Sequence, residues 1–223
     1  MTVRERRHSS ATSLSVIRAF AAVAVFALVG AFGLARADAP DAADPHAHHR
    51  QMMQQQSAQS IRRSEIEYTL PDVRLVRQDG KAVSLKDAIG DDRPVLVNFI
   101  YTTCTTICPL SSQVFAQFQS KLGAAKAKVH LVSFSIDPEQ DTPARLVEYA
   151  QKFHAGPNWE HFTGTVEASV AVQRSFDAYR GDKMNHGPLT LMRAAHGKQW
   201  VRFDGFASAD ELLAEYQDLI ARH

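Results

Sequence analysis

The chain holds two cysteines, and both lie in one short stretch, Tyr101-Thr-Thr-Cys104-Thr-Thr-Ile-Cys108-Pro109. A pair four positions apart in one turn brings the two Cα atoms within reach of a disulfide, which needs roughly 4.4–6.8 Å. When reduced, the same two thiolates can bind one soft metal ion. The alternative is a structural disulfide, but closing so short a loop stabilises little. A closed zinc site is disfavoured, because it needs four ligands and the chain has two thiols.

The predicted elements on either side place the cysteine pair at a strand–helix junction. The apolar run Val95–Ile100 predicts a buried strand. After the cysteines, apolar residues recur at helical spacing over 110–122, and Gly123 is typical of a helix end. Because free backbone N–H groups at a helix N-terminus favour an anion, we expect a thiolate at this position to have a lowered pKa.

His186 is the favoured candidate for a third ligand among the ten histidines. It lies in Met184-Asn185-His186-Gly187-Pro188, just before a predicted strand at 189–192. Glycine and proline make this segment a loop, and loops at strand ends frequently hold ligand sites. Met184 is either a soft neighbour of a bound ion or a packing residue. Four other histidines have structural interpretations at strand starts, helix ends and turns: His130, His154, His161 and His196.

The remaining pattern predicts an α/β fold. Hairpins are indicated around Asp79-Gly80 and His196-Gly197, and a capping box at Ser208-Ala-Asp-Glu211 opens a final helix. Further helices are expected from Pro143 and over 166–176, and a second central strand over 129–136. This order predicts a thioredoxin-like fold, with a mixed central sheet flanked by helices and an N-terminal β-hairpin. Such a fold does not by itself define a function.

The N-terminal region has the composition of a targeting segment. Residues 1–37 begin with arginines and continue with an uncharged apolar run at 19–35. They are expected to form either a signal peptide, cleaved after Ala37, or a retained anchor in the inner membrane. In both cases the rest of the chain would be exported to the periplasm. Residues 38–63 lack apolar periodicity and predict a linker, so the folded domain is expected at 64–223.

The linker contains five candidate copper ligands, since imidazole and thioether both bind copper. They are His46, His48, His49, Met52 and Met53. A solvated linker with chance histidines and methionines is an equally supported interpretation.

Overall charge argues against a nucleic-acid partner. The 223 residues carry a formal charge of +1, and the first 37 contribute +4, which leaves −3 on the remainder. A mildly acidic exported domain has no electrostatic basis for binding nucleic acid.

Three motifs, in order along 64–223, resemble the Sco/SenC family of cytochrome c oxidase assembly proteins. The first is the cysteine stretch after the Asn-Phe-Ile strand. The second is Ser135-Ile-Asp-Pro-Glu-Gln-Asp-Thr-Pro143, and the third is Asn185-His186-Gly187. Two of the motifs depart from the family pattern: Thr105 replaces the usual proline, and Asn185-His186-Gly187 replaces Asp-His-Ser.

The resemblance implies a thioredoxin-like fold and one copper ion, Cu(I) or Cu(II), held by Cys104, Cys108 and His186. It also implies copper delivery to the dinuclear centre of cytochrome c oxidase. The partner would be the copper-centre subunit of that oxidase or another copper client. Two thiolates and an imidazole suit Cu(I), and disulfide formation would abolish the site.

A second hypothesis is a thiol–disulfide oxidoreductase that acts on client cysteines. Its catalytic redox pair would be Cys104, the attacking thiolate, and Cys108, the resolving thiol. This activity does not need His186 as a ligand. A peroxide-reducing enzyme on the same fold is a third interpretation, but the sequence does not place the arginine and hydroxyl that it needs.

Overall fold

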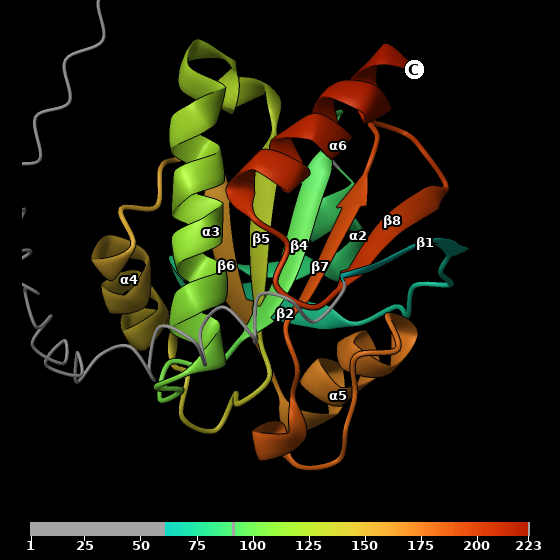
Figure 1. Ribbon diagram of the computed structural model, residues 1–223. Coiled ribbons are helices and arrows are strands. Elements are labelled where there is room, and N and C mark those ends of the chain that lie inside the picture. Colours follow the sequence, from blue (N-terminus) through green and yellow to red (C-terminus); the bar gives the residue numbers. More distant parts are fainter. Residues whose placement is uncertain (1–60, 91, 223) are drawn as a thin grey trace, which may run out of the picture. The chain divides into compact units, whose positions relative to one another are not determined.

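The computed structural model describes residues 61–90 and 92–222, which build one mixed sheet covered by helices (Figure 1). The strand order is β1-β8-β7-β4-β5-β6-β2-β3. Pairing is parallel between β4 and β5 and between β5 and β6, and antiparallel elsewhere. The strands are β1 (Arg62–Glu67), β2 (Arg74–Arg77), β3 (Ala82–Ser84), β4 (Val95–Ile100), β5 (His130–Ser135), β6 (Trp159–Thr163), β7 (Leu189–Arg193) and β8 (Gln199–Asp204). The helices are α2 (Leu85–Ile89), α3 (Ile107–Leu122), α4 (Pro143–Lys152), α5 (Val166–Ser175) and α6 (Ala209–Ala221), with short 3₁₀ turns η1 (Gly123–Lys128) and η2 (Lys183–Asn185).

The centre of the sheet is the parallel pair β4 and β5, and every residue of both strands is buried. Two of their polar side chains are paired, because Ser133 Oγ donates to Asn98 Oδ1 at 2.6 Å and accepts from Trp159 Nε1 of β6 at 2.9 Å. A strand buried on both faces reads as a continuous apolar run. The predicted central strand at Val95–Ile100 is therefore confirmed.

Helices α3 and α6 cover one face of the sheet, as Figure 1 shows in green and red. Phe118 of α3 and Tyr216 of α6 meet edge to face, with ring centroids 6.1 Å apart. The predicted capping box opens α6, where Ser208 and Glu211 satisfy each other's backbone N–H groups. The expected end of α3 is also confirmed, since Gly123 adopts a positive φ of 53° there.

Both predicted hairpins are present as β2–β3 and β7–β8. Gly80 has a φ of 82° in the first turn and His196 a φ of 55° in the second. Strand β1 was not predicted. It adds to the edge of β8 and places Arg62 and Arg63, which the sequence interpretation assigned to the linker, inside the sheet.

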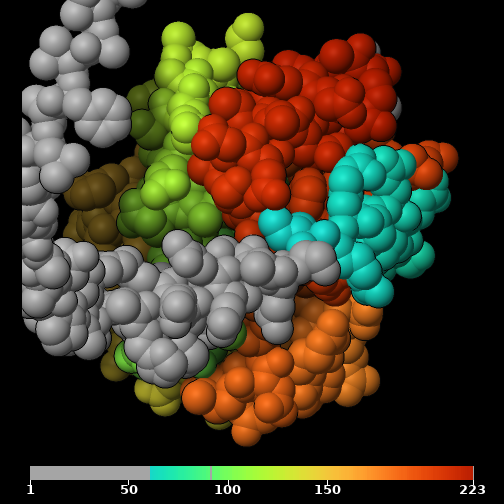
Figure 2. Space-filling model, viewed as in Figure 1, coloured from blue at the N-terminus to red at the C-terminus, as the bar shows by residue number. Residues whose placement is uncertain are grey.

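Strand β1 also contacts α6. Figure 2 shows the first described residues in cyan beside the C-terminal residues in red. Arg63 Nε donates to Glu215 Oε2 at 2.7 Å, so the first described strand is fixed to the last helix. The predictions for residues 1–37 and most of the linker lie outside the described residues. Within residues 61–90 and 92–222, no helix combines the length and apolarity needed to cross a membrane.

The sheet topology brings three loops to one edge. Because β4 and β5 are parallel, with Ile100 opposite Ser135, their carboxyl ends lie side by side. Strand β7 runs antiparallel to β4, with Thr190 opposite Asn98, so it begins at the same edge. The cysteine loop (residues 101–106), the acidic loop (136–142) and the histidine loop (181–188) therefore meet there.

Candidate metal centre

The two cysteines occupy the first turn of α3 and the loop just before it. Cys104 Sγ accepts a hydrogen bond from the backbone N–H of Cys108, with the sulfur 3.4 Å from the nitrogen. The capping residue Thr106 makes no side-chain cap, so the sulfur satisfies one of the free N–H groups of the helix. Cys104 is 8% exposed and Cys108 is 1% exposed, and both are free thiols.

The surroundings shift the pKa values of the two thiols in opposite directions. Burial raises the pKa of Cys104, but backbone N–H groups of Cys108 and Thr106 lower it by more, to about 7. For Cys108, burial dominates and raises the pKa far above its ordinary value. Cys104 is thus substantially ionised at neutral pH, as the sequence predicted for a thiolate at a helix N-terminus.

Tyr101 connects the cysteine loop to the histidine loop. Its hydroxyl donates to the Sδ atom of Met184 at 3.6 Å, and the neighbouring Tyr101 side chain helps to lower the pKa of the Cys104 thiol. Burial and the neighbouring Cys104 raise the pKa of Tyr101 to about 12, so it stays a donor. Tyr101 stands in the cysteine motif, but its role has no signal in the sequence because Met184 lies 83 positions away.

Asp141 fixes the cysteine loop to the acidic loop. Its carboxylate is wholly buried and accepts from the backbone N–H of Thr102 at 3.1 Å and from the Thr102 hydroxyl at 2.6 Å. It also accepts from Ser135 Oγ at 2.6 Å. The side chain of the neighbouring Thr142 caps α4, the helix expected from Pro143, which leaves Asp141 to position the cysteine loop.

An ion pair fixes the histidine loop. Lys183 Nζ donates to Oδ2 of the buried Asp137, and the same ammonium lies 5.6 Å from the centre of the Tyr101 ring. Asp137 belongs to the second sequence motif, and its partner Lys183 has no sequence signal because the two lie far apart in the chain. All three loops are therefore joined to one another.

His186 lies in the histidine loop but faces inward. It is 7% exposed, and its Nε2 lies 3.3 Å from the carbonyl oxygen of Phe99 on β4. Burial lowers the pKa of His186, so the imidazole is neutral at pH 7. Among the described residues, no three histidine, cysteine or acidic side chains are grouped closely enough to hold one ion. The structure thus brings the histidine loop beside the cysteine loop, but the imidazole of His186 points to β4.

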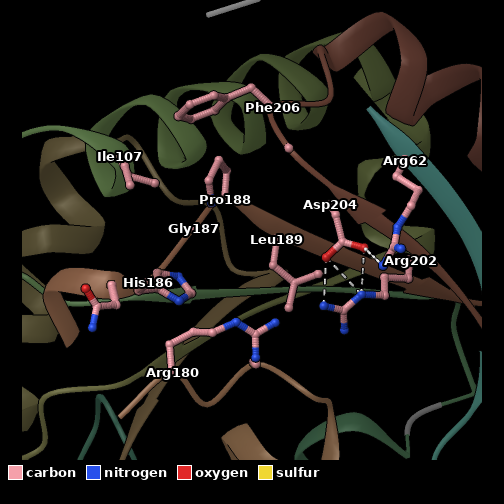
Figure 3. A pocket seen from close by; sticks show the side chains of 13 residues that line it. Arg62, Ile107, Arg180, His186, Gly187, Pro188, Leu189, Arg202, Asp204 and Phe206 are labelled. Atoms are coloured by element: carbon pink, nitrogen blue, oxygen red, sulfur yellow. Dashed lines mark hydrogen bonds and ion pairs between the residues drawn. The ribbon is translucent and has the colours of Figure 1, made fainter. Parts of the chain in front are cut away.

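A recess opens beside the imidazole (Figure 3). It has a volume of about 670 Å³, and Ile107, Pro188 and Phe206 contribute apolar lining while Arg180 contributes charge. Ile107 directly precedes Cys108, so the first turn of α3 and the histidine loop share one surface hollow.

The other histidines have structural surroundings. His130 Nε2 lies 3.0 Å from Glu160 Oε2, and His161 is buried with its Nδ1 2.9 Å from Gln78 Oε1. His154 and His196 are exposed, each with a positive φ next to an element end. None of the four lies in the cysteine, acidic or histidine loop.

Comparison with known protein families matches residues 63–221 to SCO1/SenC. The chain belongs to this family. The SCO1 protein homolog of Bacillus subtilis (strain 168) is 35% identical over 106 residues, which cover 47% of this chain and 54% of that protein. Protein SenC of Rhodobacter capsulatus is 30% identical over 118 residues, which cover 53% of this chain and 52% of that protein. The matches span about half the length of these two Sco relatives.

Solved Sco structures share the fold. A SCO1/SenC family lipoprotein from Bacillus anthracis has a TM-score of 0.61 and 25% identity, over 70% of this chain and 98% of that one. Arabidopsis thaliana ScoI, solved with copper bound, has a TM-score of 0.58 and 26% identity, over 69% and 98%. BsSco, described as a member of the Sco family of cytochrome c oxidase assembly proteins, has a TM-score of 0.58 and 28% identity, over 70% and 95%. The predicted thioredoxin-like fold and family are confirmed.

Proposed function

We propose that this Sco chain is an exported copper metallochaperone that binds one copper ion through Cys104, Cys108 and His186. Its client would be the copper-centre subunit of a cytochrome c oxidase. The observation that carries the proposal is the ionised Cys104 at the start of α3, with a second thiol one helical turn away and a neutral imidazole in the adjoining loop.

The donor set suits Cu(I). Thiolates and imidazole are ligands that this soft ion accepts, and three donors match its low coordination number. With a pKa of about 7, Cys104 is about half deprotonated at neutral pH, whereas Cys108 must release its proton when it binds the metal. Two Sco relatives were solved with copper bound, which supports copper as the metal that this chain carries. BsSco is described as a member of a family of cytochrome c oxidase assembly proteins, which supports the oxidase as the client.

Completing the site needs a shift of the histidine loop. His186 Nε2 lies 3.3 Å from the carbonyl oxygen of Phe99, and among the described residues the imidazole and the two thiols are not grouped closely enough to hold one ion, so a ring nitrogen has to approach the sulfurs. Side-chain contacts of Lys183 and Met184 hold the start of this loop, and the backbone N–H of Gly205 donates to the carbonyl oxygen of Pro188 at its end, at 3.0 Å. A rearrangement of the loop on metal binding is therefore part of the proposal.

The thiol asymmetry also favours a second candidate function, thiol–disulfide exchange. Cys104 has the pKa near 7 of an attacking thiolate, and the protonated Cys108 is positioned to resolve a mixed disulfide. This chemistry uses no atom of His186. Substitution of His186 therefore separates the two functions.

The test is an anaerobic titration of the reduced full chain with Cu(I) against a competing chelator. Wild type is expected to bind one tight equivalent, which Cys104→Ser, Cys108→Ser and His186→Ala each weaken by at least about tenfold. His154→Asn, an exposed histidine with a backbone that asparagine tolerates, is the matched control. Unchanged affinity in His186→Ala, with thiol exchange intact, would contradict the chaperone and favour the oxidoreductase.

A further inference from the structure

Met184 is the most exposed large apolar side chain of the described residues. It is 72% exposed, whereas the other large exposed ones, Leu110, Val166 and Ile220, lie at 43–45%. A thioether with so little packing makes a small contribution to the core. Core packing therefore does not explain a methionine at this position of the histidine loop, two residues before His186.

The thioether is nevertheless oriented. Tyr101 Oη donates to Met184 Sδ at 3.6 Å, and the backbone carbonyl oxygen of Tyr101 accepts from the backbone N–H of Cys104 at 3.1 Å. Tyr101 therefore contacts both sulfur-containing residues, Met184 of the histidine loop and Cys104 of the cysteine loop. The backbone N–H of Met184 is fixed as well, because it donates to Asp182 Oδ1 at 2.8 Å.

The donors of this site are layered by depth. Met184 is 72% exposed, whereas Cys104, His186 and Cys108 are buried at 8%, 7% and 1%. An ion arriving from solvent therefore meets the Met184 thioether before it meets the buried donors. A neutral thioether and a thiolate are both ligands that select Cu(I) over harder ions.

We propose that Met184 Sδ and Cys104 Sγ form a transient docking site through which Cu(I) enters and leaves the inner site. This inference rests on the proposed chaperone function. Copper stays Cu(I) throughout. As it moves inward, the bond to Met184 breaks, bonds to Cys108 and His186 form, and the proton of the Cys108 thiol passes to solvent.

A transient ligand has a distinct kinetic signature. Because Met184 binds copper on the path and not in the final complex, its removal slows loading and unloading by the same factor and leaves the equilibrium affinity unchanged. A permanent ligand would instead change the affinity.

The experiment follows Cu(I) transfer by stopped flow between a coloured bis-chelator complex and the reduced full chain, in both directions. Met184→Leu is expected to slow both rates about tenfold, with an affinity within about twofold of wild type. Met192→Leu makes the same change at a wholly buried site on β7 and is expected to keep wild-type rates. Met184→His, which restores a copper donor, is expected to recover part of the rate.

Each other result overturns the inference in a recognisable way. Wild-type rates in Met184→Leu would show that the thioether is not on the path. A loss of affinity equal to that of His186→Ala would make Met184 a permanent ligand. Failure of the wild-type chain to bind Cu(I) would instead overturn the proposed function, and the inference with it.

Discussion

Cys104 and Cys108 carry the same functional group, and their surroundings separate them. Cys104 Sγ accepts a hydrogen bond from a backbone N–H at the start of α3, and the Cys108 side chain is buried in the core. A partly ionised Cys104 and a protonated Cys108 suit stepwise binding of an ion, because about half of the Cys104 thiols are already deprotonated at neutral pH.

This difference predicts the pH dependence of alkylation. In Cys108→Ser, the iodoacetamide rate at Cys104 is expected to rise about tenfold between pH 6 and pH 8, because a pKa near 7 places most of the thiolate's formation in that interval. In Cys104→Ser, Cys108 is expected to stay nearly unreactive over the same range, because burial raises its pKa. The measurement is the mass-spectrometric alkylation rate. Equal profiles for the two cysteines would contradict the account.

At the residue scale, the sequence predicted what depends on local spacing. The cysteine pair, the helix that follows it and the loop position of His186 all follow from neighbouring residues. The roles of Tyr101 and Asp141 were missed, because their partners Met184 and Thr102 lie 83 and 39 positions away. Such pairings arise only when the sheet brings separate loops to one edge.

Among the elements, the junction of the cysteine loop with the acidic loop depends on one buried carboxylate. Asp141→Ala is expected to lower the free energy of unfolding by about 2–4 kcal/mol, because it leaves the donors of Thr102 and Ser135 without a partner. Urea unfolding measures this change. Glu139→Ala, an exposed neighbour in the same loop, is the control and is expected to stay within about 0.5 kcal/mol. A similar loss in both variants would contradict the special role of Asp141.

The histidine loop depends on its ion pair with the acidic loop. Lys183→Gln removes the cation beside the buried Asp137, so the backbone amides of residues 183–187 are expected to exchange about tenfold faster. Hydrogen–deuterium exchange with mass spectrometry reads this directly. Lys198→Gln, at an exposed turn position, serves as the comparison. If both variants exchange alike, the ion pair does not hold the loop.

Prediction of the elements succeeded where periodicity or turn residues are strong. The buried strand β4, the hairpins at Gly80 and His196 and the capped α6 all have such signals. Strand β1 was missed because it is an edge strand of mostly charged residues, RRSEIE, a composition that does not indicate a strand. Its strand conformation comes from its pairing with β8.

Across the whole molecule, the domain is joined to a histidine- and methionine-containing segment outside the described residues. If that segment collects copper, replacing His46, His48, His49, Met52 and Met53 by serine and leucine will remove weak additional equivalents and keep the one tight equivalent. Isothermal titration with Cu(I) under a chelator buffer distinguishes the two classes. Replacing Gln54, Gln55 and Gln56 by asparagine is the matched control. Unchanged weak binding after the histidine and methionine replacements would make the segment a simple linker.

The central claim is that one copper ion is held by two cysteine sulfurs and one histidine nitrogen. X-ray absorption at the copper edge of the one-to-one Cu(I) complex tests it most directly. The account predicts a first shell of two sulfurs and one nitrogen in wild type, with the nitrogen lost in His186→Ala and one sulfur lost in Cys108→Ser. A shell that contains sulfur alone, or one that His186→Ala leaves unchanged, would contradict it.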